Sequence, residues 1–166
     1  MQIFLPQSRY PIDNSQFRAP AAGANAPALS RPSAFFSRLL ERIRALPGVE
    51  AAGAVTALPL NDVAIDFDMP VVIEGQPRPR PGEEPQADFR VASTGYFEAM
   101  GIRILQGRDF NEFDDSSSAA VMIINETLAR QMFPGENPLG KRVILYGRPR
   151  EIVGVINAVR DNGFRI

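Results

Sequence analysis

The feature of this sequence that most constrains its fold is a block in the second half, where short apolar runs alternate with turn residues. Within this block, Asn125 is expected to cap a helix over residues 125–133 that turns Leu128 and Met132 toward the core. The two runs after this helix are expected to pair as a hairpin around residues 147–149. The apolar runs predict strands at residues 102–105, 121–124, 141–146 and 151–159.

The first half of the chain predicts a β-α-β unit. Residues 2–5 and 49–56 are the strand candidates, and residues 6–32 form a long loop rich in proline and alanine. Ser33 is expected to cap the helix between the strands, which ends near Ala45. The apolar stripe of this helix is expected to pack on one face of a sheet. The stripe consists of Phe36, Leu39, Leu40, Ile43 and Leu46.

From residue 57 the pattern changes to short strands and turns. Strands are expected at residues 71–74 and 88–92, separated by a solvated proline-rich stretch at residues 77–85. Thr94 is expected to cap a short helix, and Gly101 is expected to supply the left-handed residue that ends it. We therefore expect an α+β fold.

Composition excludes several functional classes. The chain contains neither cysteine nor histidine, which rules out thiol nucleophiles, imidazole catalysis, Ser-His-Asp triads and nearly all zinc sites. A net charge of -1 over 166 residues gives no electrostatic reason to expect nucleic-acid binding. No apolar run approaches the roughly 20 residues that span a bilayer. Residues outside this sequence would have to anchor it to a membrane.

A near-match to a phosphate-binding loop runs from Gly135 to Lys141. A Walker A loop needs G-x-x-x-x-G-K followed by Ser or Thr, because backbone N–H groups cradle the phosphates and the hydroxyl holds Mg²⁺. Here Arg142 takes the hydroxyl position, Pro138 removes one N–H donor, and the helix precedes the loop instead of following it. We therefore predict a structural turn and no nucleotide site.

The best metal candidate is an acidic group that follows Gly107. A calcium loop needs oxygen ligands at its first, third and fifth positions, glycine at the sixth and glutamate at the twelfth. Counted from Asp109, the fifth position is Phe113 and the twelfth is Ala120, so the pattern fails. We interpret the group as a solvated acidic turn. It consists of Asp109, Glu112, Asp114 and Asp115.

Two other charged groups have a functional and a structural interpretation. Asp62, Asp66 and Asp68 could supply the carboxylate pair of a glycoside hydrolase, but no aromatic residues cluster beside them to bind a sugar. Arg108 and Asp109 could form a site, but a local ion pair that anchors a turn is favoured. We assign no catalytic, cofactor-binding or metal-binding residue.

Uncharged candidates are interpreted in the same way. The sequon that begins at Asn125 lies at a helix start, so we interpret it as capping chemistry alone. A set of aromatic and methionine side chains could line a ligand groove, but such residues at helical spacing are more often core. The set consists of Tyr96, Phe97, Phe110, Met132 and Phe133.

The order of the motifs along the chain is similar to that of a known family. The motifs are YFEAMGI, LQGRDF, INETLARQMFPGENPLGKRV and EIVGVI, preceded by LPGVEAAGAVTALPL. Together they resemble the extracytoplasmic core domain of macrolide-exporter-type (MacB-like) ABC transporter permeases. The nearest likeness is to permeases whose ATPase is a separate chain.

This resemblance implies a fold with two parts. One part is porter-like and built from β-α-β units, and the other is an inserted, strand-rich part called Sabre. Residues 1–56 would be the first porter-like β-α-β unit, and residues 57–166 would be most of the Sabre-like subdomain. The second porter-like unit of the family would follow residue 166 and is absent from this sequence.

The resemblance also implies a non-catalytic role on the periplasmic face of the bacterial inner membrane. ATP hydrolysis by a cytoplasmic ABC ATPase would move the transmembrane helices of the full-length permease, and this domain would transmit the movement outward. The implied partners are that ATPase, a second permease chain, and a periplasmic adaptor or the transported substrate. The domain itself would carry no cofactor, bind no nucleic acid and not insert into the membrane.

Two alternatives from other functional classes remain open. An independent soluble ligand-binding module would need a concave apolar pocket with a few convergent polar groups. A carboxylate hydrolase would need two acidic residues about 5 to 10 Å apart in a cleft.

Overall fold

The structure is a computed structural model that describes residues 2–6, 31–56, 68–77, 79–80, 85–115, 118–145 and 147–158. The elements alternate between short strands and three helices over these residues. In chain order they are β1 (Gln2–Pro6), α1 (Arg31–Arg44), β2 (Asp68–Pro70), β3 (Val72–Ile73), β4 (Gln86–Ala92), α2 (Tyr96–Ala99), β5 (Ile104–Gly107), β6 (Val121–Asn125), α3 (Glu126–Met132), β7 (Arg142–Leu145) and β8 (Arg148–Ile156).

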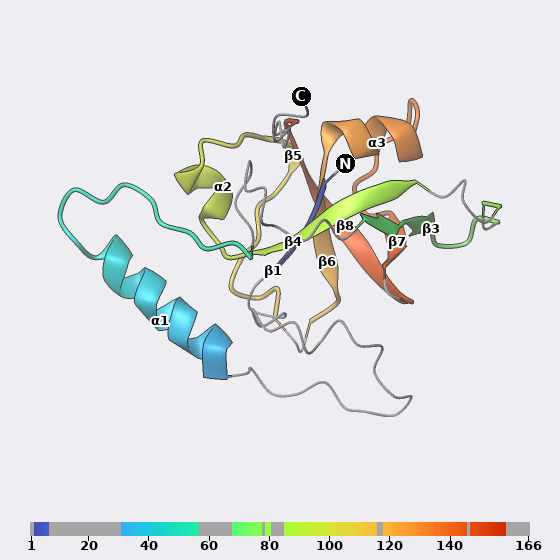
Figure 1. Cartoon of the computed structure of the whole chain (residues 1–166). Coiled ribbons are helices and arrows are strands. Elements are labelled where there is room, and N and C mark those ends of the chain that lie inside the picture. The colour runs from blue at the N-terminus through green and yellow to red at the C-terminus, as the bar shows by residue number, and fades with distance from the viewer. Residues whose placement is uncertain are drawn as a thin grey trace, which may run out of the picture.

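The strands form one mixed sheet in the order β2-β4-β1-β6-β8-β7-β3, with β5 also paired to β8 (Figure 1). The first strand of the chain lies in the interior of the sheet, because β1 runs parallel to β4 on one side and antiparallel to β6 on the other. Strands β6 and β8 are parallel, and α3 with β7 connects them. This mixture of helices with parallel and antiparallel strands confirms the expected α+β class.

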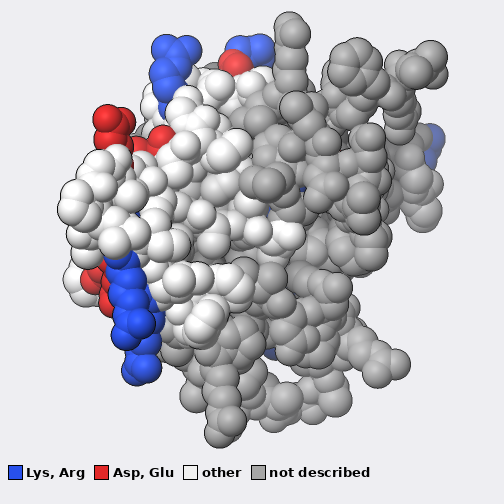
Figure 2. All heavy atoms as spheres, turned by 60° about the vertical axis from the view of Figure 1, so that its left-hand side comes forward, with Lys and Arg blue, Asp and Glu red and all other residues white. Residues whose placement is uncertain are grey.

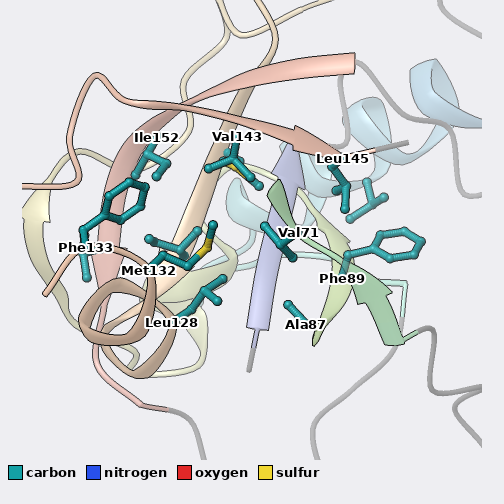
Figure 3. Packing of buried hydrophobic residues seen from close by; sticks show 13 residues of the cluster. Val71, Ala87, Phe89, Leu128, Met132, Phe133, Val143, Leu145 and Ile152 are labelled. Atoms are coloured by element: carbon teal, nitrogen blue, oxygen red, sulfur yellow. The ribbon is translucent and has the colours of Figure 1, made fainter. Parts of the chain in front are cut away.

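Both faces of the sheet carry a hydrophobic cluster. All five residues of β6 are buried, because this strand lies in the middle of the sheet with cover on both sides. On one face, Leu128 and Met132 of α3 and Phe133, which follows the helix, pack in one cluster with Ile152 of β8 and other buried residues (Figure 3). On the other face the buried residues are Phe4, Ala92, Tyr96, Phe97, Ile102, Phe110, Val121, Ile123 and Ile156.

Two local predictions in the second half are confirmed. The side chain of Asn125 caps α3 by accepting a hydrogen bond of 2.9 Å from the N–H of Leu128. Strands β7 and β8 form the predicted hairpin, with Leu145 opposite Arg148. The turn is tighter than expected, since Arg148 and Pro149 already belong to β8. The buried side chain of Arg150 supports this turn by donating to the carbonyl of Leu145.

Two predicted helix caps are wrong. Helix α1 begins at Arg31, so Ser33 lies inside the helix and does not precede it. The residue that precedes α2 is Gly95, with φ of 74° and no side-chain hydrogen bond, where Thr94 was expected to cap the helix. Gly101 does take the predicted left-handed conformation, with φ of 64°.

The predicted strand over residues 49–56 is also wrong in most of its length. Only Val55 forms a bridge, opposite Ala92 at the end of β4. The N–H of Thr56 donates to the carbonyl of Val91, and the N–H of Ser93 donates to the carbonyl of Ala54. A short antiparallel contact therefore replaces the expected strand of a β-α-β unit.

Helix α1 extends away from the sheet (Figure 1). Its apolar stripe is only partly buried. Leu40 is buried, but Leu39 is 38% exposed and Leu46 is 57% exposed. The expectation that this stripe packs on a sheet is wrong for these two residues. Helical spacing identifies an apolar face, but it does not determine which surface covers that face.

Candidate functional site

The glycine loop after α3 is a structural turn. The ammonium of Lys141 pairs with the carboxylate of Glu136 and lies 4.9 Å from the centroid of the Phe133 ring. A phosphate-binding lysine must instead point its charge into an open cradle. The ammonium of Lys141 therefore already interacts with neighbouring groups, Glu136 and the Phe133 ring.

The backbone donors of this loop are also engaged. The N–H of Gly140 donates to the carbonyl of Ile152 at 2.9 Å, and the N–H of Lys141 donates to the carbonyl of Pro138 at 3.1 Å. The N–H of Leu139 is bonded to the side chain of Asn137. Because these donors turn inward, the geometry supports the predicted turn and gives no anion cradle.

The acidic turn is organised by one ion pair. The guanidinium of Arg108 donates to both carboxylate oxygens of Asp114, at 2.7 and 2.8 Å. The N–H of Asn111 donates to the same carboxylate at 2.8 Å. The expected pair between Arg108 and Asp109 is therefore wrong in its partner, because the turn places Asp114 opposite the guanidinium and leaves only the backbone carbonyl of Asp109 within reach.

The pKa values of two carboxyl groups in this turn, Asp109 and Asp114, are shifted in opposite directions. Burial raises the pKa of Asp114, but hydrogen bonds from Arg108 and from the backbone of Asn111 lower it by more, so the pKa lies below its ordinary value. Burial raises the pKa of Asp109 above its ordinary value, although the N–H of Phe110 donates to its carboxylate. Within the described residues, no three or more acidic side chains gather to hold a metal ion.

Sequence reasoning missed the most exposed aromatic residue of this turn. Phe113 is 83% exposed, and its N–H donates to the side chain of Asn111 at 2.9 Å. No periodic pattern identifies such a residue, since its exposure depends on how the ion pair folds the turn.

The other acidic candidates are only partly visible. Asp62 and Asp66 lie outside the described residues. Asp68 opens β2 and lies opposite Asp88 of β4 in the antiparallel register. The hypothesis of a paired-carboxylate hydrolase therefore stays a prediction.

The aromatic and methionine residues that could have lined one groove lie on opposite faces of the sheet. Tyr96, Phe97 and Phe110 are buried in the cluster around Phe4, whose ring centroid lies 5.0 Å from that of Phe97. Met132 and Phe133 are buried on the α3 face. The interpretation of these side chains as core is confirmed.

The sequon residue Asn125 is only 4% exposed and its side chain is engaged as the helix cap. Its amide therefore lies in the interior of the fold, as the capping interpretation requires.

An open groove of about 380 Å³ lies between β5 and α3. The strand pairing between β5 and β8 shifts register between Ile104 and Gln106, and this irregularity brings consecutive residues Leu105 and Gln106 to the same groove. Apolar side chains make much of the lining, and the charged groups at its margin include Glu126 and Arg130, which form an ion pair. The lining residues are Leu105, Gln106, Glu126, Ala129, Arg130, Phe133, Pro134, Gly135, Glu136, Pro138 and Val155.

Helix α1 presents a second apolar surface. Phe35 is 61% exposed and its ring meets that of Phe36 edge-on, with centroids 5.5 Å apart. Figure 2 turns this side of the molecule forward and shows uncharged surface between separate basic and acidic groups. Its described part offers no continuous basic patch of the kind that binds nucleic acid. Across the described ranges, no helix combines the length and apolar character needed to span a bilayer.

Comparisons with known proteins place these features in context. The model of the MacB-like periplasmic core domain family matches residues 7–165. The chain is 38% identical over 69 residues to the macrolide export ATP-binding/permease protein MacB of Aggregatibacter actinomycetemcomitans, covering 42% of the chain and 11% of that protein. It is 29% identical over 143 residues to the pyoverdine export ATP-binding/permease protein PvdT of Pseudomonas putida, covering 81% of the chain and 21% of that protein.

A third relative is the ABC transporter permease YknZ of Bacillus subtilis, which is 34% identical over 77 residues, covering 46% of the chain and 19% of that protein. The chain thus spans between 11% and 21% of the length of these three relatives. Among solved structures, the periplasmic region of MacB from Actinobacillus actinomycetemcomitans has a TM-score of 0.48 at 24% identity, covering 72% of the chain and 50% of that structure. The extracellular domain of YknZ has a TM-score of 0.47 at 24% identity, covering 70% and 54%.

Proposed function

The chain belongs to the family of MacB-like periplasmic core domains, and from this premise we propose that it transmits ATP-driven movement to a partner or substrate outside the membrane. The observation that carries the proposal is the family match over residues 7–165. The domain would act as a mechanical lever between the membrane helices of an ABC transporter permease and the periplasm. We propose no catalytic step for it.

The packing of the described sheet supports this proposal. The sheet is packed on both faces, and a body with two filled faces transmits displacement with little deformation. The charged groups that sequence reasoning singled out form local pairs, such as Arg108 with Asp114 and Lys141 with Glu136. Groups paired in this way stabilise turns and are not arranged around a common reacting centre.

The proposal includes partners outside this chain. A cytoplasmic ABC ATPase would act through the full-length permease, whose transmembrane helices would anchor the domain to the inner membrane. A second permease chain would complete a dimer, and a periplasmic adaptor or the substrate would receive the movement. We also propose the division into a porter-like unit at residues 1–56 and a Sabre-like subdomain at residues 57–166.

The test measures movement of the domain during the ATPase cycle. A spin label at Gln131→Cys, on the exposed surface of α3, would report the distance between the two copies in the reconstituted permease with its ATPase. The chain has no native cysteine, so this label site is unique within the domain. We expect the distance to change between the nucleotide-free and ATP-bound states, and not in a variant whose ATPase cannot bind ATP. An unchanged distance in all states would reject the lever.

A second candidate function follows from the groove between β5 and α3. Its apolar lining and partly charged margin fit an independent ligand-binding module that takes small apolar molecules. The probe would be a fluorescent naphthylamine titrated into the chain, with Leu105→Glu as the groove variant and Leu39→Glu on α1 as the control. Loss of dye binding in the groove variant alone would favour this function, whereas equal binding in all three chains would reject it.

A further inference from the structure

The side chain of Arg44 links the C-terminal end of α1 to two other segments of the domain. Arg44, the last residue of α1, donates from Nε and Nη2 to the carbonyl of Ala52, at 3.1 and 2.8 Å. The same Nη2 donates to the carbonyl of Thr94 at 2.6 Å. The guanidinium therefore joins three segments, namely the end of α1, the segment that returns to the sheet, and the residues that precede α2.

The segment at Ala52 is itself fixed to the sheet. The N–H of Ala54 donates to Oγ of Ser93 and the N–H of Ser93 donates to the carbonyl of Ala54, both at 2.8 Å. At Gly53 the backbone packs so closely that an added Cβ would lie 2.3 Å from Cα of Tyr96. The acceptor at Ala52 is thus held by a short bridge and by close backbone packing.

The acceptor at Thr94 is connected to the core through α2. The next residue, Gly95, has φ of 74°, and an added Cβ there would lie 2.9 Å from Nη2 of Arg44. It is followed by Tyr96 and Phe97, which are 2% and 1% exposed and pack around Phe4 of β1. A displacement of Arg44 would therefore reach β1, an interior strand of the sheet, through these aromatic residues.

The apolar face of α1 contributes less to this attachment than a packed helix would. Leu40 is buried, but Phe35, Leu39 and Leu46 are exposed. Each hydrogen bond of Arg44, in contrast, joins a cation to a carbonyl with fixed fork geometry. Rotation of α1 about its C-terminal end would first break these directional hydrogen bonds. We propose that Arg44 is a positioning residue that sets the direction in which α1 leaves the sheet and carries movement between them.

This inference rests on the proposed lever function for its purpose, but its test does not. Spin labels at Arg38→Cys on α1 and Gln131→Cys on α3 measure the orientation of the helix in the 166-residue chain by pulsed electron resonance. A second labelled pair, Glu98→Cys on α2 with Gln131→Cys, measures the body alone. Each pair is compared in the native background and with Arg44→Ala, Arg44→Lys or Arg42→Ala.

In the native background, we expect each labelled pair to give a single narrow distance distribution. Arg44→Ala and Arg44→Lys are expected to broaden or shift the α1 distance, because neither side chain can bridge the two carbonyls in the same way, while the body distance stays constant. Arg42→Ala, in the same last turn, is expected to leave both distances unchanged.

Two results would overturn the inference. An α1 distance that is the same in Arg44→Ala as in the native background would mean that other contacts orient the helix. A body distance that changes together with the α1 distance, in Arg44→Lys as well as in Arg44→Ala, would mean that Arg44 supports the whole fold and is not a joint. Movement of the full-length permease during the ATPase cycle tests the lever separately, so the failure of one proposal is distinguishable from the failure of the other.

Discussion

The guanidinium of Arg108 forms a bidentate salt bridge with the carboxylate of Asp114, from Nη1 to Oδ2 at 2.7 Å and from Nη2 to Oδ1 at 2.8 Å. Asp114 is 4% exposed, whereas nearly half of the Arg108 side chain reaches solvent. The buried carboxylate is thus stabilised as an anion by a partner that remains hydrated. This salt bridge closes the acidic turn that follows β5.

Asp114→Asn is expected to lower the free energy of unfolding at pH 7 by about 1 to 3 kcal/mol, since a charge-assisted pair is replaced by weaker neutral bonds. The pKa of Asp114 is lowered in the folded chain, because bonds from Arg108 and Asn111 outweigh the effect of burial. Its stabilisation is therefore complete above the unfolded pKa of about 3.9 and is lost as pH falls through the folded pKa. Urea unfolding at several pH values down to about 3 checks this.

The matched control is Glu112→Gln in the same turn, whose side chain is exposed. Burial raises the pKa of Asp109, so its contribution to stability depends on pH with the opposite sign. This contribution is common to the native chain and to Asp114→Asn, and it cancels in the difference between their free energies of unfolding. A difference between Asp114→Asn and the native chain that does not shrink at low pH would contradict the assignment.

Gly107→Ala is expected to destabilise the fold more than Gly135→Ala does, by at least about 1 kcal/mol. The two glycines have nearly the same backbone conformation, with φ of 74° and 75°, so the left-handed strain is shared. A Cβ on Gly107 would lie 2.2 Å from the carbonyl oxygen of Val153, whereas a Cβ on Gly135 would meet nothing within 4 Å. Thermal unfolding of the two variants compares them directly, and equal losses would show that overlap with β8 is relieved without cost.

Leu128→Ala is expected to lower the free energy of unfolding by about 2 to 5 kcal/mol, because its side chain is fully buried and leaves a cavity. Leu39→Ala is expected to change it by less than about 1 kcal/mol, since Leu39 is 38% exposed in the described structure. The sequence alone predicted a core role for Leu39 in α1. Urea unfolding at neutral pH decides, and a loss at Leu39 as large as that at Leu128 would show that α1 is covered in solution.

Lys141→Ala is expected to leave the fold intact and to change stability by about 1 kcal/mol or less, as the residue contributes one surface ion pair and one cation–aromatic contact. ATP is expected to give no binding heat with either chain, because the loop donors already bond to carbonyls of Ile152 and Pro138. Calorimetric titration with Mg²⁺ and ATP measures this. Saturable binding that disappears in Lys141→Ala would reverse the interpretation of the loop.

The candidate groove shows the limit of sequence reasoning for sites. Phe133 was singled out from the sequence, but Leu105 and Val155 were not, because they reach the groove from β5 and β8. The register irregularity that turns Leu105 toward it depends on pairing between strands separated by some fifty residues of chain. An alternating pattern along one strand carries no record of such an irregularity.

The sequence by itself determined the features that depend on near neighbours along the chain. The cap at Asn125, the buried side of α3, the β7–β8 hairpin and the rejection of a phosphate cradle all follow from interactions within a few residues. Only the tertiary structure decided that β1 lies between β4 and β6, that Arg108 pairs with Asp114, and that Arg44 links a partly exposed α1 to two distant segments. These outcomes depend on which distant segments meet, and periodicity specifies that a face is apolar or a donor is charged without specifying what it will contact.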